Sequence, residues 1–381
     1  RPRGADGQRR QNQCQDECRP ADRLRAASPH AHRSSLSGHG AMTLRAPEPR
    51  MKRRVSGSTA RCPEGDSWRE STIAAPSGVR PSDTECAMPQ LETNGITVEY
   101  DTFGAADARP LLLVMGLGAQ MIAWDEEFCD LLADRGHYVI RFDNRDVGLS
   151  TKFDDHPVPD MAELVGKMMA GETPDVPYTL DHMADDAIGV LDALGIERAH
   201  VAGASMGGMI VQTMGIRHAP RLKSMVSIMS TTGDPQVPPA TPEAMAALTS
   251  PVPADLEAFI ERSLSVGGVI GSPGFERDLE RARRRAAEVH ARSVYPQGTA
   301  RQMAAVVAHG DRTAALSQVD VPTLVIHGDA DPLVRPEGGH ATASALPRAE
   351  LLMIEGMGHD LPVGTWETIV DAMARHTEAH H

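Results

Sequence analysis

Short apolar runs that recur after residue 88 constrain the fold more than any other feature of this sequence. The first is unbroken over residues 111–115, and similar runs follow at 138–142, 199–202, 225–229, 323–326 and 351–354. Such runs are typical of strands that are buried on both faces, as in a parallel sheet. Helical patterns, for example over 182–194 and 365–376, stand between most of them. Strands that alternate with helices predict an α/β fold with a mostly parallel sheet.

The segment before the first run predicts a hairpin. Ile96, Val98 and Tyr100 alternate with polar residues, which is the pattern of a half-buried strand. Asn94-Gly95 precedes them and is typical of a two-residue hairpin turn.

One interval of about ninety residues, between the runs at 225–229 and 323–326, breaks the alternation. It is too long for a loop and has helical patterns separated by Pro and Gly. These patterns cover residues 244–248, 256–264, 275–289 and 300–307. We predict a core domain whose first part is 88–230 and whose second part is 319–381, with a helical cap inserted at 231–318.

Residues 1–87 differ in composition from the rest of the 381-residue chain. They hold 16 Lys and Arg against 10 Asp and Glu, a net charge of +6, whereas residues 88–381 carry −20. Only six of the 87 residues are Leu, Ile, Val or Phe, which is too few to bury a core. We therefore predict a disordered N-terminal extension. A transit peptide, a basic arm for nucleic acid and an upstream stretch before a natural start at Met88 are the alternatives.

Cysteine usage and short motifs bear on compartment and cofactors. Four of the five cysteines lie within residues 1–87, and no matching Cys or His pair with zinc-finger spacing follows Cys14 and Cys18. Cys129 stands alone after residue 88, which fits a reducing compartment such as the cytoplasm. The chain has no H-E-x-x-H motif, no Walker loop and no apolar stretch near 18 residues. We therefore expect no cofactor, no metal, no membrane and no nucleic acid.

The strongest chemical motif is a G-x-S-x-G pattern, residues 203–207, centred on Ser205. It follows the strand-like run at 199–202 and opens a helical stretch at 209–216. A serine on such a strand–turn–helix stands in a strained backbone position with its hydroxyl exposed above the sheet edge. The motif predicts a nucleophile at Ser205. A glycine- and serine-rich turn that only joins strand to helix is the alternative.

A serine nucleophile needs a histidine base that is oriented by an acid, and with this turn the chain order is serine, acid, histidine. Asp331 follows the predicted strand at 323–326, and His359 follows the one at 351–354 in a glycine-rich loop. The carboxyl ends of parallel strands meet at one edge of the sheet, so both side chains reach the rim that carries the serine. We predict the catalytic triad Ser205, Asp331 and His359.

Asp329 competes with Asp331 for the role of the acid. Pro332 holds Asp331 extended and clear of the strand. Asp329 is nearer the strand and suits a turn in which its carboxylate bonds its own backbone. We therefore favour Asp331.

Two backbone N–H groups are predicted to form an oxyanion hole. Met206 follows the serine at the helix N-terminus, where N–H groups and the helix dipole favour negative charge. Leu117 lies in the glycine-rich loop after the first buried run. A plain glycine-rich turn is the alternative for this loop.

The loop also allows a rival interpretation, a dinucleotide-binding fingerprint. Gly116 and Gly118 match its first two glycines, and Asp143 ends the next strand. Met121 occupies the third glycine position, where a bulky side chain hinders helix–strand packing, so we disfavour the dinucleotide interpretation.

The charged segment 143–150 has two interpretations. It either contacts substrate or forms a salt-bridged turn that braces the rim of the site, and we favour the bracing turn.

These motifs together resemble the α/β-hydrolase superfamily over essentially all of residues 88–381. The resemblance is closest to a bacterial branch with carboxylesterases and methylesterases of anthracycline intermediates, and it rests on stretches 114–120, 141–150, 203–208 and 356–362. It implies an eight-stranded sheet flanked by helices, a helical cap, the same Ser-Asp-His triad and no cofactor. Many relatives carry His-Gly at the oxyanion loop. Met115-Gly116 stands here, which keeps the backbone donor but loses the bracing imidazole.

We predict a serine hydrolase that cleaves a small-molecule carboxylic ester through an acyl-enzyme. The same triad also allows hydrolysis of lactones, thioesters and C–C bonds. A ligand receptor on the hydrolase fold, with slow or single turnover, is the alternative from a different class. The sequence defines no oligomeric state, and side chains of the predicted cap set the acyl length and the alcohol that fit.

Overall fold

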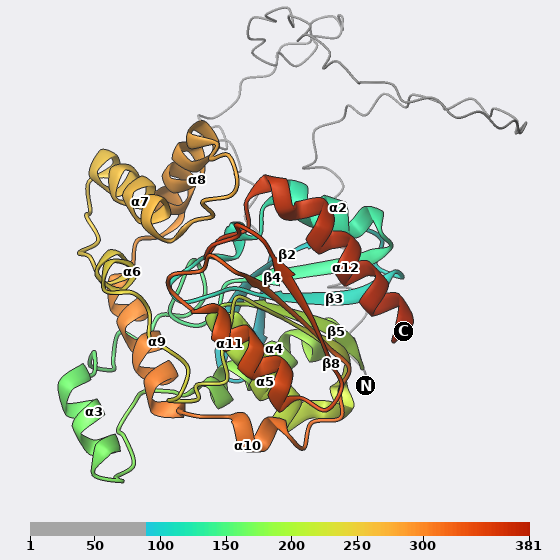
Figure 1. The fold of residues 1–381 in the computed structure, drawn as a ribbon, viewed down its shortest axis with the longest axis horizontal. Coiled ribbons are helices and arrows are strands. Elements are labelled where there is room, and N and C mark those ends of the chain that lie inside the picture. The colour runs from blue at the N-terminus through green and yellow to red at the C-terminus, as the bar shows by residue number, and fades with distance from the viewer. Residues whose placement is uncertain (1–88) are drawn as a thin grey trace, which may run out of the picture. The chain divides into compact units, whose positions relative to one another are not determined.

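The computed structural model describes residues 89–381, which surround one central sheet (Figure 1). The predicted extension over 1–87 and its four cysteines lie outside the described residues. None of the helices within 89–381 combines the length and the hydropathy that a membrane span requires.

Eight strands form this sheet in the order β1-β2-β4-β3-β5-β6-β7-β8, which confirms the predicted eight-stranded sheet. β2 is antiparallel to both of its neighbours, and all other neighbouring strands are parallel. The chain passes from β3 to β4 on one side and then to β5 on the other, and such a reversal opens a crevice at the carboxyl ends of the strands. The strands are β1 (Gln90–Thr93), β2 (Ile96–Phe103), β3 (Arg109–Val114), β4 (His137–Phe142), β5 (Ala199–Ala204), β6 (Leu222–Ile228), β7 (Thr323–Gly328) and β8 (Ala349–Ile354).

The turn between β1 and β2 confirms the predicted hairpin. Thr93 pairs with Ile96 across it, so Asn94 and Gly95 form a two-residue loop. Their φ angles are +46° and +77°. Positive values at both positions match the right-handed twist of the flanking strands, and Asn-Gly tolerates them best.

Helices cover both faces of the sheet (Figure 1). One face carries α4 (Leu180–Ala193), α5 (Met206–His218) and α11 (Pro336–Ala345), and the other carries α2 (Glu126–Asp134) and α12 (Trp366–Ala379). Residues 206–215 of α5 are buried all round. This helix, which follows Ser205, is therefore held from every side.

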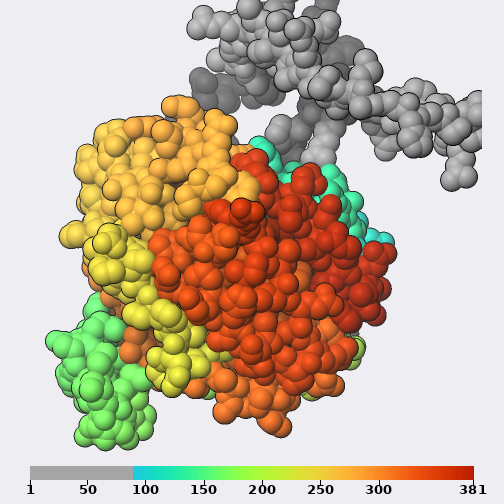
Figure 2. Space-filling view, in the orientation of Figure 1, coloured from blue at the N-terminus to red at the C-terminus, as the bar shows by residue number. Residues whose placement is uncertain are grey.

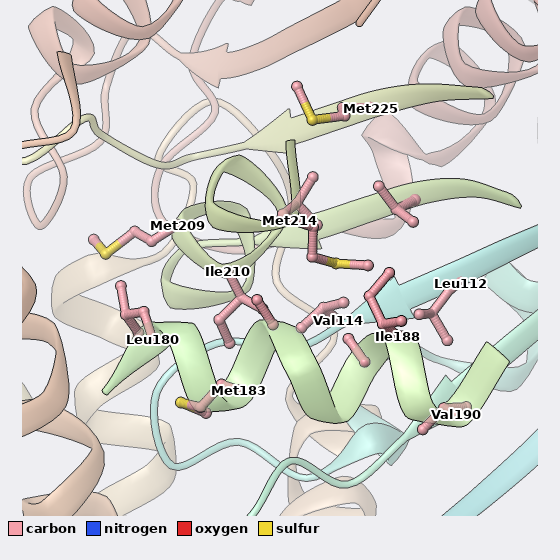
Figure 3. Close-up of a cluster of buried hydrophobic side chains, with 14 of the residues drawn as sticks. Leu112, Val114, Leu180, Met183, Ile188, Val190, Met209, Ile210, Met214 and Met225 are labelled. Carbon is pink, nitrogen blue, oxygen red and sulfur yellow. The ribbon is translucent and has the colours of Figure 1, made fainter. Parts of the chain in front are cut away.

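Methionines fill much of the space between α4, α5 and the sheet (Figure 3). Met183 of α4 and Met209 and Met214 of α5 belong to one buried cluster with Leu112 and Val114 of β3. Flexible thioethers fill irregular gaps between rigid elements. The helix after Ser205 is thus packed on the strand that precedes the oxyanion loop.

Five helices lie between β6 and β7, in the interval where the strand pattern is interrupted, and four of them precede the short α10 (Thr313–Leu316) (Figure 1). Phe259 and Ile260 pack with Ala286 in a small buried cluster, which is separate from the two larger clusters on the faces of the sheet. The limits 231–318 of the cap stay a prediction. The four helices are α6 (Pro242–Leu248), α7 (Leu256–Ile270), α8 (Leu279–Arg292) and α9 (Pro296–His309).

α8 begins at Leu279, four residues later than the pattern over 275–289 predicts. Asp278 accounts for the difference because its carboxylate accepts the N–H of Arg281 at 2.9 Å and caps the helix. The preceding backbone is engaged elsewhere, since the N–H of Gly274 donates to the carbonyl of Gly356 at 2.9 Å.

The remaining helices are short. α3 (Met161–Met169) lies in the proline-rich segment after β4, and in the space-filling view it lies on the same side of the molecule as α6 and α7 (Figure 2). Near the end of the predicted cap, Leu316 of α10 packs with Val319 in the buried cluster that includes α4 and α5. The others are α10 (Thr313–Leu316), η1 (Met121–Ala123), η2 (Ala219–Arg221) and η3 (Val363–Thr365).

Four buried histidines link the stability of this fold to pH. Burial lowers the pKa of His137, His200, His327 and His376. For His200, burial and the nearby charge of Lys223 lower the pKa to about 3. The unfolded chain protonates a histidine below about pH 6.5, whereas the folded protein keeps His200 neutral. The unfolded state then binds more protons, so stability is present above pH 6.5 and is lost as the pH falls.

We expect His200 alone to remove about 1.4 kcal/mol from the free energy of unfolding between pH 7.5 and 5.5. Urea unfolding at the two pH values measures the loss. His200→Gln cannot titrate and should lose less over the same interval. Equal losses in the two proteins would contradict the prediction.

Candidate active site

Ser205 lies at the sharp turn from β5 into α5. Its φ and ψ are +56° and −119°, a strained conformation for a residue with a side chain. The surrounding backbone fixes the turn. The N–H of Ser205 donates to the carbonyl of Ile228 at 2.9 Å, and its own carbonyl accepts from Ser230 Oγ at 2.8 Å.

Backbone contacts explain the two glycines of the G-x-S-x-G motif. A Cβ on Gly203 would lie 2.1 Å from the carbonyl oxygen of Gly207. A Cβ on Gly207 would lie 2.1 Å from the carbonyl oxygen of Val114. Because main-chain atoms cannot yield as a flexible side chain does, any larger residue would force the turn open.

The structure brings Ser205, His359 and Asp331 into one hydrogen-bonded chain. His359 Nε2 lies 3.0 Å from Ser205 Oγ, and His359 Nδ1 lies 2.7 Å from Asp331 Oδ2. Asp331 is 1% exposed, and its Oδ1 accepts the N–H groups of Leu333 and Val334, both at 2.9 Å. With its proton on Nδ1, the imidazole donates to Asp331 and accepts from the serine hydroxyl. Such a chain can move the serine proton to the imidazole.

Asp329 has a different environment from Asp331. It is exposed, and its Oδ1 accepts the N–H of Gly356 at 2.7 Å. The expectation that Asp329 bonds its own backbone is wrong, since Asp331 makes the local bonds. Asp329 instead fastens the start of the loop that carries His359.

The two predicted oxyanion donors flank the serine. Met206 is the first residue of α5, where N–H groups have no partner inside the helix. A Cβ on Gly116 would lie 3.1 Å from Ser205 Cβ, so the loop with Leu117 passes directly beside the serine. Within residues 89–381, no acceptor bonds the N–H of Leu117 or of Met206. Both are thus free to bind an oxyanion.

Asn144 braces the oxyanion loop, a contact that the sequence analysis missed. Its Nδ2 donates to the carbonyl of Met115 at 2.9 Å, and both side chains are buried. An amide from the next loop thus supplies a polar contact at the residue that precedes Gly116. No local sequence pattern predicts this contact, because Asn144 and Met115 lie 29 positions apart.

The contacts of Asp143 favour the bracing interpretation of residues 143–150. Its carboxylate accepts the N–H groups of Met121 at 2.6 Å and Leu149 at 2.9 Å, and it pairs with Arg292 of α8 at 2.9 Å. The side chain of Asp143 is fully buried. The acid that a dinucleotide site would use for a ribose is therefore engaged in holding two loops and α8 together.

Two further buried ion pairs extend this brace. Arg145 binds Asp186 of α4 through two bonds of 2.6 Å. Asp146 pairs with Arg301 of α9 at 2.8 Å and accepts from the hydroxyl of Tyr178 at 2.7 Å. Burial opposes the charge of Asp146, but these donors outweigh it and hold the pKa of the carboxyl below its usual range. α9 is thus tied to residues 143–150 by a buried ion pair, and removal of either partner would leave the other charge buried and unpaired.

The loop that carries His359 is bound to the last residue of α7 and to the segment that follows it. The N–H of His359 donates to the carbonyl of Ile270 at 2.7 Å, and the N–H of Gly358 donates to Ser272 Oγ at 2.8 Å. Ser272 Oγ in turn donates to Asp360, whose pKa is raised by burial. The backbone around the imidazole is therefore held by the end of α7 and by Ser272.

Within residues 89–381, no three His, Cys, Asp or Glu side chains are grouped to hold a metal ion. Cys129 is a buried free thiol, and burial raises its pKa to about 12. It is therefore protonated and unreactive at neutral pH.

The strand order, the helices on both faces and the strained serine turn after β5 together define an α/β-hydrolase. The family model for the α/β-hydrolase fold matches residues 109–363. The chain belongs to this family, which confirms the resemblance seen in its motifs.

Two curated relatives match most of the chain. It is 30% identical to rhodomycin D methylesterase DnrP of Streptomyces peucetius over 318 residues, which cover 76% of this chain and 97% of that protein. It is 29% identical to rhodomycin D methylesterase DauP of Streptomyces sp. strain C5, with 74% and 96% covered.

Solved structures share the fold at lower identity. A meta-cleavage product hydrolase from Pseudomonas fluorescens IP01 aligns with a TM-score of 0.60 and 18% identity, covering 77% of this chain and 98% of that one. An enol-lactonase from Burkholderia xenovorans LB400 aligns with a TM-score of 0.58 and 20% identity, covering 76% and 100%.

Proposed function

We propose that this protein is a serine hydrolase of carboxylic esters. Ser205 Oγ attacks the ester carbonyl carbon while His359 Nε2 takes the hydroxyl proton. Asp331 holds the imidazole and stabilises its positive charge. The N–H groups of Met206 and Leu117 bind the oxyanion of the tetrahedral intermediate.

The intermediate then collapses to an acyl-enzyme. The ester C–O bond breaks, and His359 gives its proton to the leaving alcohol oxygen. Water enters, His359 removes its proton, and the hydroxide attacks the acyl carbonyl. The second tetrahedral intermediate releases the carboxylic acid, and the proton returns to Ser205.

The hydrogen-bonded chain from Ser205 through His359 to Asp331 carries this proposal. The strained turn under Ser205 supports it independently, because strain of this kind concentrates at functional sites. The names of the two Streptomyces relatives support an ester, and among esters a methyl ester of a larger acid. The lone cysteine of residues 88–381 supports the cytoplasm as the location.

Lactones and C–C bonds are the closest chemical alternatives, since an enol-lactonase and a meta-cleavage product hydrolase share the fold. A panel of methyl esters, p-nitrophenyl esters, simple lactones and a meta-cleavage product separates them. We expect the highest kcat/KM on an ester, measured by acid release. A lactone preference of more than about tenfold would reassign the substrate while keeping the triad.

Turnover number separates an enzyme from a receptor on the same fold. With p-nitrophenyl butyrate in large excess, we expect nitrophenol release to continue linearly for many equivalents per protein. A receptor that is acylated and not hydrolysed would release about one equivalent and stop. Such a stop would overturn the proposal.

A further inference from the structure

Gln302 of α9 forms hydrogen bonds through both the oxygen and the nitrogen of its amide, one to the loop after β3 and one to the loop after β4. The side chain is fully buried. Its Oε1 accepts the N–H of Gly118 at 2.8 Å, and its Nε2 donates to the carbonyl of Arg145 at 2.7 Å. The partners fix the orientation of the amide, because the flipped form would oppose donor to donor and oxygen to oxygen.

Gly118 lies in a tight turn of the oxyanion loop. The N–H of Ala119 donates to the carbonyl of Gly116 at 3.2 Å, and the φ of Gly118 is +64°. A positive φ at the third of four positions is typical of a type II turn, which differs from type I mainly in the orientation of its central peptide. Gln302 holds the N–H of that central peptide and so selects one orientation.

Leu117 stands in this turn between two side-chain amides. Asn144 holds the loop at Met115, and Gln302 holds it on the other side of Leu117. Both amides tie the loop to the same turn, residues 143–150. The direction of the Leu117 N–H is thus set by contacts from outside the loop.

α9 packs directly on the loop. A Cβ on Gly118 would lie 2.6 Å from Thr299 Oγ1, one helical turn before Gln302. Arg301, the neighbour of Gln302, anchors the same helix through its buried pair with Asp146. A helix held this firmly can impose a position on the loop beneath it.

We propose that Gln302 is a positioning residue for the reaction: through Gly118 it fixes the loop whose Leu117 N–H binds the oxyanion. The inference rests on the proposed ester hydrolysis. It gives the cap a part in the chemical step besides shaping the pocket. An oxyanion contact strengthens in the transition state, so losing Gln302 should lower kcat while KM changes little.

Gln302→Met keeps the size of the side chain and removes both bonds. We expect kcat for p-nitrophenyl butyrate to fall about 10- to 100-fold, with KM within about threefold, since loss of a whole oxyanion donor costs about 10²–10³. An alkyl boronic acid forms a tetrahedral adduct on a serine nucleophile. Its affinity should fall by the same factor as kcat/KM.

Gln212→Met is the matched control. Gln212 is also buried, accepts from Arg312 Nε at 3.1 Å and bonds Ser227 Oγ at 3.4 Å, away from the loop. This variant should lose stability and keep its kcat, which separates positioning from buried-amide loss in general.

Gln302→Glu gives a second readout that a purely structural role would not move. An ionised carboxylate still accepts from Gly118 but opposes the carbonyl of Arg145 and the developing oxyanion. A protonated carboxyl restores both bonds, and burial raises the pKa of a glutamate. The ratio of variant to wild-type kcat should therefore rise as the pH falls.

If Gln302→Met kept the wild-type kcat, the inference would be overturned while the proposed function would stand. The same would follow if its kcat/KM fell while its affinity for the boronic acid stayed unchanged. A ratio of Gln302→Glu to wild-type kcat that does not change with pH would also overturn the positioning role of Gln302. A wild-type protein that turns over no ester would overturn the proposed function and the inference with it.

Discussion

Replacement of Ser205 by alanine is expected to lower kcat for ester hydrolysis about 10⁴- to 10⁶-fold. The change removes only Oγ, which is the attacking atom of the proposed mechanism and lies 3.0 Å from His359 Nε2. The backbone bonds of Ser205 to Ile228 and Ser230 use main-chain atoms of residue 205, so they survive. The melting temperature and the circular dichroism should therefore stay close to those of the wild type.

Ser224→Ala is the control for this prediction. Ser224 is also a buried serine, but its Oγ bonds His200 Nδ1 at 2.9 Å. It lies near the amino end of β6, whereas Ser205 follows the carboxyl end of the neighbouring parallel strand β5. We expect a loss of stability with kcat preserved. If Ser205→Ala kept more than a tenth of the wild-type turnover, Ser205 would not be the nucleophile.

The features that the sequence predicts best are those that depend on neighbouring residues. The glycines around Ser205 are dictated by contacts within the turn itself and with the adjacent strand. Asn94-Gly95 forms its hairpin because both residues tolerate a positive φ. Buried runs likewise predict β7 and β8 to within two residues of their ends.

The contacts that position the site were missed because they join distant parts of the chain. Gln302 and Gly118 are 184 residues apart, and Ser272 and Gly358 are 86 apart. Gln302 stands in a helical pattern in which no property of the residue distinguishes it from a solvent-facing amide. Its role follows only from the way α9 packs on the oxyanion loop.

The segment between β6 and β7 therefore contacts two parts of the proposed machinery. Through Gln302 it touches the oxyanion loop, and through Ile270 and Ser272 it touches the loop of His359. In the proposed mechanism, the predicted cap then influences the transition state as well as the substrates that fit. Substitutions made in the cap to change specificity should often change kcat as well.

Replacement of Asp331 by asparagine is expected to lower kcat about 10⁴-fold, because the structure leaves the new amide one favourable orientation. Oδ1 of Asp331 accepts two N–H groups, from Leu333 and Val334. An asparagine keeps its oxygen there and turns its NH₂ toward His359 Nδ1. That nitrogen must then accept, so the proton moves to Nε2 and points at Ser205. An imidazole in this tautomer cannot take the serine proton.

Asp329→Asn is the matched control for this prediction. Asp329 is exposed, and an asparagine oxygen can still accept the N–H of Gly356, so we expect kcat within about threefold of wild type. Asp331→Asn should also bind a substrate analogue normally while losing kcat, because only the tautomer of His359 changes. A nuclear magnetic resonance spectrum of the imidazole nitrogens would show the proton on Nε2 of His359 in Asp331→Asn and on Nδ1 in the wild type. If the two aspartates exchanged their effects on kcat, Asp329 would be the orienting acid and the 2.7 Å contact of Asp331 with His359 would serve only to hold the loop.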